Sequence, residues 1–218
     1  MMKRCFILLK FFIVFLLFQS GVFAFNSFHD DDGEKISLRL RPKDASLSKE
    51  GKIFLHSFME NYKNVLPQDL KPAFQTPLDV CSWLKATFQD EKSLFKESPT
   101  VFCVRAKHIK RNILVGMMFF ECCLNKDGAK IIHIRQLVVR PKSQRKGIGK
   151  KFLDFIKSLH PDFSEIIVDG RRVNTKACAF YRANGFKILE NPHDKTLSPQ
   201  EKYVGYSFKP SLSLDHQD

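Results

Sequence analysis

The sequence predicts an α+β domain whose central sheet is mixed and mostly antiparallel. Three strand-like runs follow one another at residues 100–107, 112–124 and 130–140. The last two are separated by Asn-Lys-Asp-Gly at 125–128, which is typical of a hairpin turn. A succession of strand, helix and strand over residues 136–169 then predicts one parallel pair.

Residues 1–24 differ from the rest of the chain. Two basic residues and a mostly apolar run, interrupted by Lys10, precede Ala24, a small residue at the expected cleavage edge. This pattern predicts a secretory signal peptide. An uncleaved N-terminal anchor is the alternative, because the apolar stretch approaches the roughly 20 residues that a membrane-spanning helix needs.

The next part of the chain predicts a linker, a strand and two helices. Residues 25–34 are polar and acidic and predict a solvated linker. Residues 35–42 alternate between apolar and polar side chains, as expected for a half-buried first strand. Apolar residues recur at helical spacing around Phe54 and again over residues 78–95, with Pro67 between the two helices.

The most informative stretch is residues 136–156, in which an apolar strand, a basic glycine loop and an amphipathic helix follow one another. Leu137, Val138 and Val139 form a short apolar run of high strand propensity. Pro141 disfavours a helical conformation at the residue before it, so the strand is expected to end here.

The loop predicts an anion site. It consists of Gln144, Arg145, Lys146, Gly147, Ile148 and Gly149. Because glycine has no Cβ, the backbone at Gly147 and Gly149 can approach a ligand, and the first amides of the helix point into the loop. Residues 140–151 hold six basic residues, Lys150 among them, and no acidic one. A helix N-terminus adds partial positive charge, so a pyrophosphate is the expected guest.

Two other glycine-loop sites are excluded by sequence. A P-loop ends in Gly-Lys-Ser/Thr, and a dinucleotide-binding fold needs three glycines and an acidic ribose ligand downstream. The loop has neither pattern. The remaining alternative is a tight turn without a ligand, which the six cations and a second motif downstream disfavour.

The loop resembles motif A of the GNAT superfamily of N-acetyltransferases, whose pattern is Gln or Arg, two residues, Gly, one residue, and Gly or Ala. Gln144, Gly147 and Gly149 match that pattern. Residues 174–186 resemble motif B of the same superfamily, with an Asn at the start, an aromatic-Tyr pair that ends at Tyr181, and a closing Gly-Phe.

The resemblance implies a GNAT-type sheet whose parallel pair is splayed, with helices on both faces. The motifs are specific over about residues 112–189, and the N-acetyltransferase domain is expected to span residues 35–210. Residues 211–218 are expected to form a flexible tail. The expected cosubstrate is acetyl coenzyme A, and the acetyl group is expected to move by direct attack of a primary amine on a small molecule or a protein. No metal is expected.

The resemblance also implies roles for individual residues. The strand presents backbone groups to the pantetheine arm, the loop amides hold the pyrophosphate, and the amide near Val139 polarises the thioester carbonyl. Tyr181 is the expected proton donor to the leaving thiolate. Asn174 caps the following helix or contacts the coenzyme. The expected coenzyme-binding residues are Leu137, Val138, Val139, Gln144, Arg145, Lys146, Gly147, Ile148, Gly149, Lys150 and Asn174.

The general base is the role in which this sequence departs from many relatives. Many relatives place a glutamate on the strand before motif A, and His133 occupies that region here. Histidine titrates in a useful pH range, so His133 is the predicted base, expected on the same strand face as Arg135, Leu137 and Val139. Glu121 is the second candidate.

The cysteine content limits the compartments in which the chain is expected to act, and the charge limits its alternative functions. Without residues 1–24 the chain keeps five cysteines, an odd number without a disulfide-rich spacing, so we expect reduced thiols. Acetyl coenzyme A is cytosolic, which conflicts with export. Delivery by an exporting bacterium into a host cytosol would reconcile the two, and a membrane anchor with the domain facing the cytosol is the alternative. Membrane contact is expected only if the segment is uncleaved.

The formal charge of +13 predicts attraction to anions. A nucleic-acid-binding module is disfavoured, because the aromatic residues are mostly Phe within apolar runs rather than Tyr and Trp among basic residues. An exported protein that binds coenzyme A, nucleic acid or another anion without catalysis is the alternative function.

Overall fold

The structure is a computed structural model that describes residues 25–70, 73–189 and 203–210. The predicted signal or anchor segment, 1–24, and the predicted tail, 211–218, lie outside the described residues. Within the described part of the chain, every helix is too short or too polar to cross a membrane. The predictions for the two chain ends therefore stay predictions.

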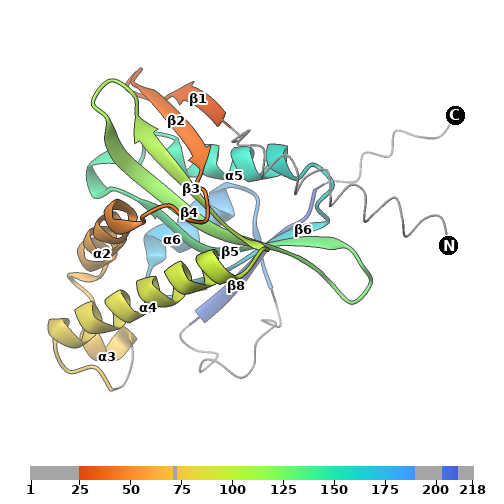
Figure 1. Cartoon of the computed structure of the whole chain (residues 1–218). Coiled ribbons are helices and arrows are strands. Elements are labelled where there is room, and N and C mark those ends of the chain that lie inside the picture. Colours follow the sequence, from red (N-terminus) through yellow and green to blue (C-terminus); the bar gives the residue numbers. More distant parts are fainter. Residues whose placement is uncertain (1–24, 71–72, 190–202, 211–218) are drawn as a thin grey trace, which may run out of the picture.

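In the described residues, eight strands form one sheet in the order β1-β2-β3-β4-β5-β6-β8-β7 (Figure 1). All neighbouring strands are antiparallel except β5 and β6, which are parallel. The mixed, mostly antiparallel sheet predicted from sequence is thereby confirmed. The strands are β1 (Phe25–His29), β2 (Lys35–Leu40), β3 (Val101–His108), β4 (Ile113–Leu124), β5 (Lys130–Val139), β6 (Glu165–Arg171), β7 (Lys187–Ile188) and β8 (Tyr203–Phe208).

Helices lie on both faces of the sheet (Figure 1). On one face lie α2 (Ser48–Tyr62), α3 (Pro67–Leu70) and α4 (Pro77–Glu97). On the other face lie α5 (Ile148–Leu159) and α6 (Thr175–Ala183). The predicted arrangement of helices on two faces is confirmed.

Two hydrophobic cores follow from this layering, and the apolar run of β4 serves both. Phe119 and Phe120 are neighbours in β4, and each has 0% of its surface exposed. Because successive side chains of a strand point to opposite faces, Phe119 packs with α2 and α4, while Phe120 packs with α5. A strand covered on both faces reads as a continuous apolar run rather than an alternating one.

The start of α4 is fixed by its own sequence. The Thr76 side chain accepts a hydrogen bond from the Asp79 N–H, and the Asp79 carboxylate accepts one from the Thr76 N–H. This is a capping box, and Pro77 at the first helical position has no N–H to leave unsatisfied. The helix therefore begins at a defined point and holds its buried face against the sheet.

Strand β5 carries one extra residue, Arg135. Phe119 of β4 pairs with Gln136 and Phe120 pairs with Ile134, so Arg135 has no counterpart in β4. Such a β-bulge bends its strand and increases the local twist. The parallel pairing of β5 with β6 ends at Ile134. The predicted splayed pair therefore has its origin at this bulge.

The predicted linker at 25–34 is wrong, because its first five residues form β1, which pairs with β2 from Phe25–Arg39 to His29–Lys35. The acidic residues that follow make a tight turn. Asp30 Oδ1 accepts hydrogen bonds from the N–H groups of Asp32 and Glu34. The polar composition of this segment is also typical of a linker. Aspartate nevertheless favours turns, because its side chain accepts hydrogen bonds from backbone N–H groups that follow it in the chain.

We expect Phe152→Ala to lower the free energy of unfolding by about 3–5 kcal/mol, because a fully buried ring is lost from the core. The ring lies so close to Gly116 that a Cβ there would come within 2.9 Å of it. Urea unfolding measures the change, with Leu124→Ala, at a 53% exposed site, as the control. Equal stability of the two variants would contradict the assigned packing.

Candidate functional site

The loop between β5 and α5 has a backbone suited to an anion. After the short 3-10 helix η1 (Pro141–Ser143), Arg145 has a φ of 61° and Gly147 a φ of 72°, both left-handed. Left-handed residues within a turn direct successive amides toward one side and form a concave anion-binding nest. Gly147 is also the N-cap of α5, and no side chain caps that end. The first amides of α5 are therefore available to a ligand.

Three predicted coenzyme residues have structural roles in this loop. The Gln144 Nε2 donates a hydrogen bond of 3.1 Å to the Val139 carbonyl, which closes the loop back onto β5. The Ile148 side chain is buried in the core, so only its backbone can reach a ligand. A Cβ on Gly149 would lie 2.9 Å from the Phe180 ring. Glycine at 149 therefore permits the close approach of α5 and α6.

The basic side chains around the loop differ in their partners. Arg145 is exposed at the loop tip. Lys150 pairs with Asp154 one helical turn ahead at 3.0 Å, a surface contact that a stronger anion can displace at little cost. Lys146 pairs with Asp32 of the β1–β2 turn. Its hydrogen bond to that carboxylate raises the pKa of Lys146, which keeps the side chain charged.

The edge of β5 beyond the bulge presents backbone groups. The Arg140 N–H donates to the Val115 carbonyl of β4. Because successive backbone groups of a strand point to opposite sides, the Val139 N–H points toward the β6 side. The pairing with β6 has already ended at Ile134. Within the described residues, the predicted carbonyl-polarising amide at Val139 thus lies on a strand edge that β6 does not pair with, and Leu137 offers its backbone on the same side.

The side chains of these strand residues lie in the two cores. Val138 is 3% exposed and belongs to the core beneath α2 and α4. Leu137 and Val139 pack against the core beneath α5 and α6. The strand can therefore contribute to coenzyme binding through its backbone.

Tyr181, the predicted proton donor, lies in α6 among aromatic rings. Its ring centroid is 5.2 Å from that of Phe180, 5.4 Å from that of Phe186 and 5.7 Å from that of Tyr206. Burial, followed by the nearby Cys178, raises the pKa of Tyr181 well above its usual value. The phenol therefore stays protonated at neutral pH, as a proton donor must, and its catalytic role stays a prediction.

Asn174 is the N-cap of α6. Its Oδ1 accepts a hydrogen bond of 3.1 Å from the Ala177 N–H, and Gly185 closes the far end of the helix with a φ of 81°. The capping role predicted for Asn174 is confirmed, and a coenzyme contact stays a prediction.

His133, the predicted base, lies on the face of the sheet that carries α4. Its Nε2 is 3.8 Å from Asp169 Oδ2 of β6, and 29% of its side chain is exposed. Burial lowers the pKa of His133, with the Asp169 carboxylate opposing the shift. The imidazole is therefore neutral at pH 7 and can accept a proton.

The expected position of His133 on one face with Leu137 and Val139 is wrong. Ile132 and Ile134 belong to the core under α5 and α6, against which Leu137 and Val139 also pack. Regular alternation would put 132 and 137 on opposite faces. The extra residue in the bulge shifts the alternation by one, so His133 lies on the opposite face from Leu137 and Val139.

The face of the sheet that carries α4 holds a polar cluster that was not predicted from the sequence. Arg135 Nε lies 2.9 Å from Glu91 Oε2, and its Nη1 lies 3.2 Å from Glu121 Oε2. The Thr100 hydroxyl donates to the other oxygen of Glu121. These contacts occupy Glu121, the second candidate base. A sequence cue exists, because Glu91 falls on the helical stripe of buried residues that includes Leu84 and Phe95.

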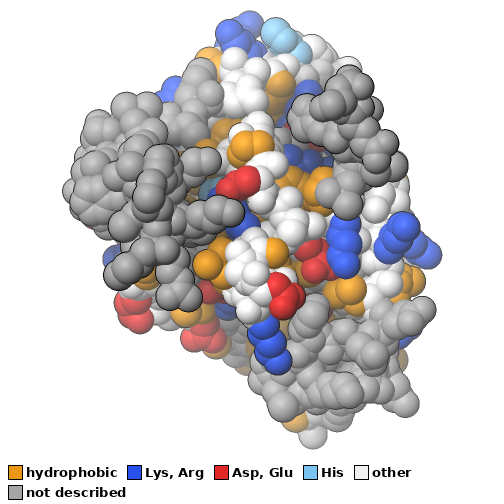
Figure 2. Space-filling view, turned by 90° about the vertical axis from the view of Figure 1, so that its right-hand side faces the viewer, with side chains coloured by type: hydrophobic (Ala, Val, Ile, Leu, Met, Phe, Trp, Pro, Cys, Tyr) orange, Lys and Arg blue, Asp and Glu red, His pale blue; other side chains and the backbone are white. Residues whose placement is uncertain are grey.

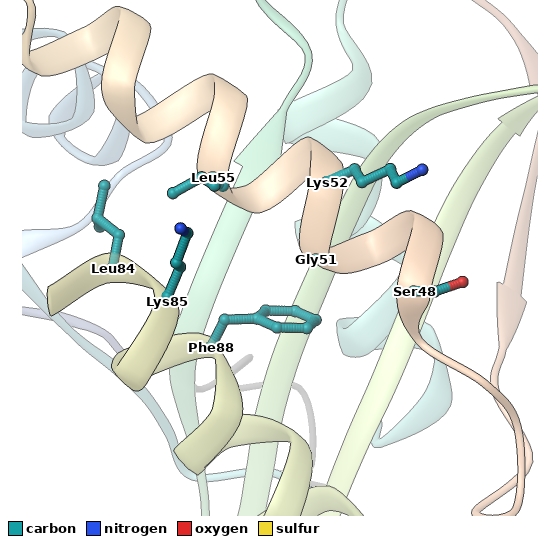
Figure 3. A pocket seen from close by; sticks show the side chains of 7 residues that line it. All are labelled: Ser48, Gly51, Lys52, Leu55, Leu84, Lys85 and Phe88. Atoms are coloured by element: carbon teal, nitrogen blue, oxygen red, sulfur yellow. The ribbon is translucent and has the colours of Figure 1, made fainter. Parts of the chain in front are cut away.

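The described residues also contain two hollows, both lined in part by α2. One, of about 250 Å³, lies between α2 and α4, with the Phe88 ring beneath Gly51 (Figure 3). The other, of about 450 Å³, is lined by residues that include Lys49, Lys52 and Arg140. Across the described ranges, His, Cys, Asp and Glu side chains nowhere gather in a group of three or more that could hold a metal ion.

Residues 98–188 match the family model of the acetyltransferase (GNAT) domain, which confirms the resemblance seen in the sequence. No curated protein matches the chain. Among solved structures, the chain is similar to the PaiA N-acetyltransferase from Thermoplasma acidophilum in complex with coenzyme A. The two are 16% identical with a TM-score of 0.60, and the match covers 80% of this chain and 99% of that chain.

Two further solved structures are similar over most of their length. For a GNAT-family acetyltransferase from Listeria monocytogenes, the identity is 11%, the TM-score 0.55 and the coverage 85% of this chain and 100% of that one. For the GNAT domain of S. lividans PAT, the identity is 10% and the TM-score 0.54, and the match covers 85% of this chain and 97% of that one. At these identities the likeness shows the fold.

We expect Glu91→Gln to lower the free energy of unfolding by about 1–3 kcal/mol, because Arg135 would lose one of its two carboxylates at a mostly buried position. Glu97→Gln on the exposed side of the same helix is the matched control, expected to change stability by less than about 0.5 kcal/mol. Urea unfolding measures both. If the two variants unfold alike, Glu121 alone holds the bulge.

Proposed function

The chain carries an acetyltransferase domain of the GNAT family, and from that premise we propose that it moves an acetyl group from acetyl coenzyme A to a primary amine by direct attack. The proposal rests on two features of the backbone that follow one another without a break. The open backbone edge of β5 at Leu137 and Val139 leads directly into the amide nest at Gly147. An extended pantetheine arm fits the first and a pyrophosphate fits the second.

The chemistry requires a neutral amine to attack the thioester carbonyl. A carbon–nitrogen bond forms, and the resulting oxyanion accepts a hydrogen bond from the Val139 N–H. The carbon–sulfur bond then breaks, the departing thiolate takes a proton from the Tyr181 hydroxyl, and the proton that the attacking nitrogen releases as the amide forms restores that hydroxyl. The proton lost by the incoming ammonium goes to His133, whose imidazole is neutral at pH 7 and lies beside Asp169.

The acceptor class within this proposal is an amine on a small molecule or on a protein. Lysine side chains, protein N-termini, aminoglycosides, polyamines and amino acids all satisfy the chemistry. The α4 side of the sheet is where we expect acceptor choice to be made, because His133 and Asp169 lie there. Measuring thioester cleavage with a panel of these amines would separate them.

The rival proposal is an anion-binding protein without catalysis. Figure 2 shows one face on which acidic, basic and hydrophobic side chains of the described residues are interspersed. A nucleic-acid-binding face is expected to be more uniformly basic. Binding to RNA that collapses with salt, without thioester cleavage, would favour the rival.

We also propose that the chain is exported through residues 1–24 and acts where acetyl coenzyme A is present, in a host cytosol. Free thiols support a reducing compartment: the cysteines at 81, 103, 122, 123 and 178 are all unbridged. A membrane anchor with the domain facing the cytosol is the alternative. Finding the chain in the producing cell's cytosol with residues 1–24 intact would contradict export.

Isothermal titration of residues 25–218 with acetyl coenzyme A tests the loop. We expect Gly147→Asp to weaken binding by at least about 100-fold, because a carboxylate at the nest repels the pyrophosphate. Gly128→Asp is the matched control: Gly128 has a similar φ of 78° in the β4–β5 turn, with nothing within 4 Å of the added Cβ. Equal binding by both variants would contradict the assigned site.

The pH dependence of kcat tests the base. Because burial lowers the pKa of His133 from its usual value, kcat should rise with pH through the acidic range and level off near neutrality, where the imidazole is deprotonated. His133→Gln should lower kcat by about 100-fold and remove the acidic limb. A variant with unchanged turnover and an unchanged pH profile would show that another group accepts the proton.

A further inference from the structure

The acidic turn between β1 and β2 lies directly on the anion loop. The Asp32 carboxylate forms an ion pair with Lys146. Asp31 Oδ1 lies 3.1 Å from the position that a Cβ would take on Gly147, the N-cap of α5. Two carboxylates therefore occupy the neighbourhood in which a pyrophosphate is expected.

The turn is held in this position by contacts on both sides. Asp30 Oδ1 accepts the N–H groups of Asp32 and Glu34, at 3.1 and 2.8 Å, which fixes the turn itself. The Glu34 carboxylate then contacts His108 at 3.0 Å and Arg111 at 2.9 Å, at the end of β3 and in the turn after it. The turn is thus a built part of the hairpin edge, and its hydrogen bonds to Asp30 use the Asp32 backbone N–H and leave the Asp32 carboxylate to Lys146.

The chemistry of the turn matches that of the expected ligand. A carboxylate, like a phosphate, is an anion that accepts hydrogen bonds from backbone amides and from lysine. The N-terminus of a helix favours either one. Two anions at one nest repel each other, so a pyrophosphate can occupy the loop amides fully only when Asp31 has moved away.

We propose that Asp31 and Asp32 form an internal competitor for the coenzyme site, so that binding of coenzyme A displaces the β1–β2 turn from the loop. This inference rests on the proposed function, because it takes the loop as the pyrophosphate site. The competing carboxylates lower the affinity for coenzyme A. They also make the first strand of the chain, outside residues 98–188, a determinant of donor binding.

Isothermal titration of residues 25–218 with coenzyme A is the first test. The variant Asp31→Asn/Asp32→Asn keeps Asp30 and hence the turn, and should bind coenzyme A about tenfold more tightly than the parent chain. The matched control, Asp44→Asn/Asp127→Asn, makes the same change in net charge at exposed positions and should bind like the parent. Equal or weaker binding by the Asp31/Asp32 variant, relative to this control, overturns the proposal.

Hydrogen exchange of the parent chain gives a second readout. Displacement predicts faster exchange at the amides of Asp32 and Glu34 when coenzyme A is bound, because their bonds to Asp30 are strained or lost as the turn moves. Unchanged or slower exchange there contradicts displacement. Failure of the proposed function has a different signature, since none of the variants would then bind coenzyme A.

Discussion

One extra residue in β5, Arg135, is the constraint on which the arrangement of the site depends. The bulge ends the pairing with β6 at Ile134 and shifts the alternation of side chains by one. As a result, Leu137 and Val139 keep their side chains in the core while their backbone edge is open. Glu91 and Glu121 hold Arg135 by ion pairs, so the bulge is tied to α4 as well as to the sheet. The geometry of the proposed donor side and of the proposed acceptor side therefore depends on the same residue.

Local chemistry explains why most of the fold could be predicted from sequence. The turn at 125–128, the N-cap at Asn174 and the left-handed end at Gly185 are determined by atoms within a few residues. The glycine loop belongs to the same class, because its φ values and the free amides of α5 follow from neighbouring residues. The family match over residues 98–188 covers this locally encoded part of the chain.

The features that sequence reasoning missed depend on contacts between distant residues. Lys146 and Asp32 are 114 residues apart, and Arg135 and Glu91 are 44 residues apart. The acidic stretch at 30–33 reads as a linker by composition, and only its place in the fold shows that it lies on the loop. The face of His133 was mispredicted for a related reason, since the extra residue at Arg135 is defined by the pairing with β4, although the two consecutive polar residues Arg135 and Gln136 are a cue to it in the sequence.

A crystal structure of residues 25–218 with coenzyme A would test the central claim most directly, namely that the loop from Gln144 to Gly149 holds the pyrophosphate. The predicted result has pyrophosphate oxygens within about 3 Å of the amides at Gly147 and the start of α5, with the Asp31 carboxylate withdrawn from them. A pyrophosphate bound elsewhere, with Asp31 still beside Gly147, would contradict both the assigned donor site and the competition at it.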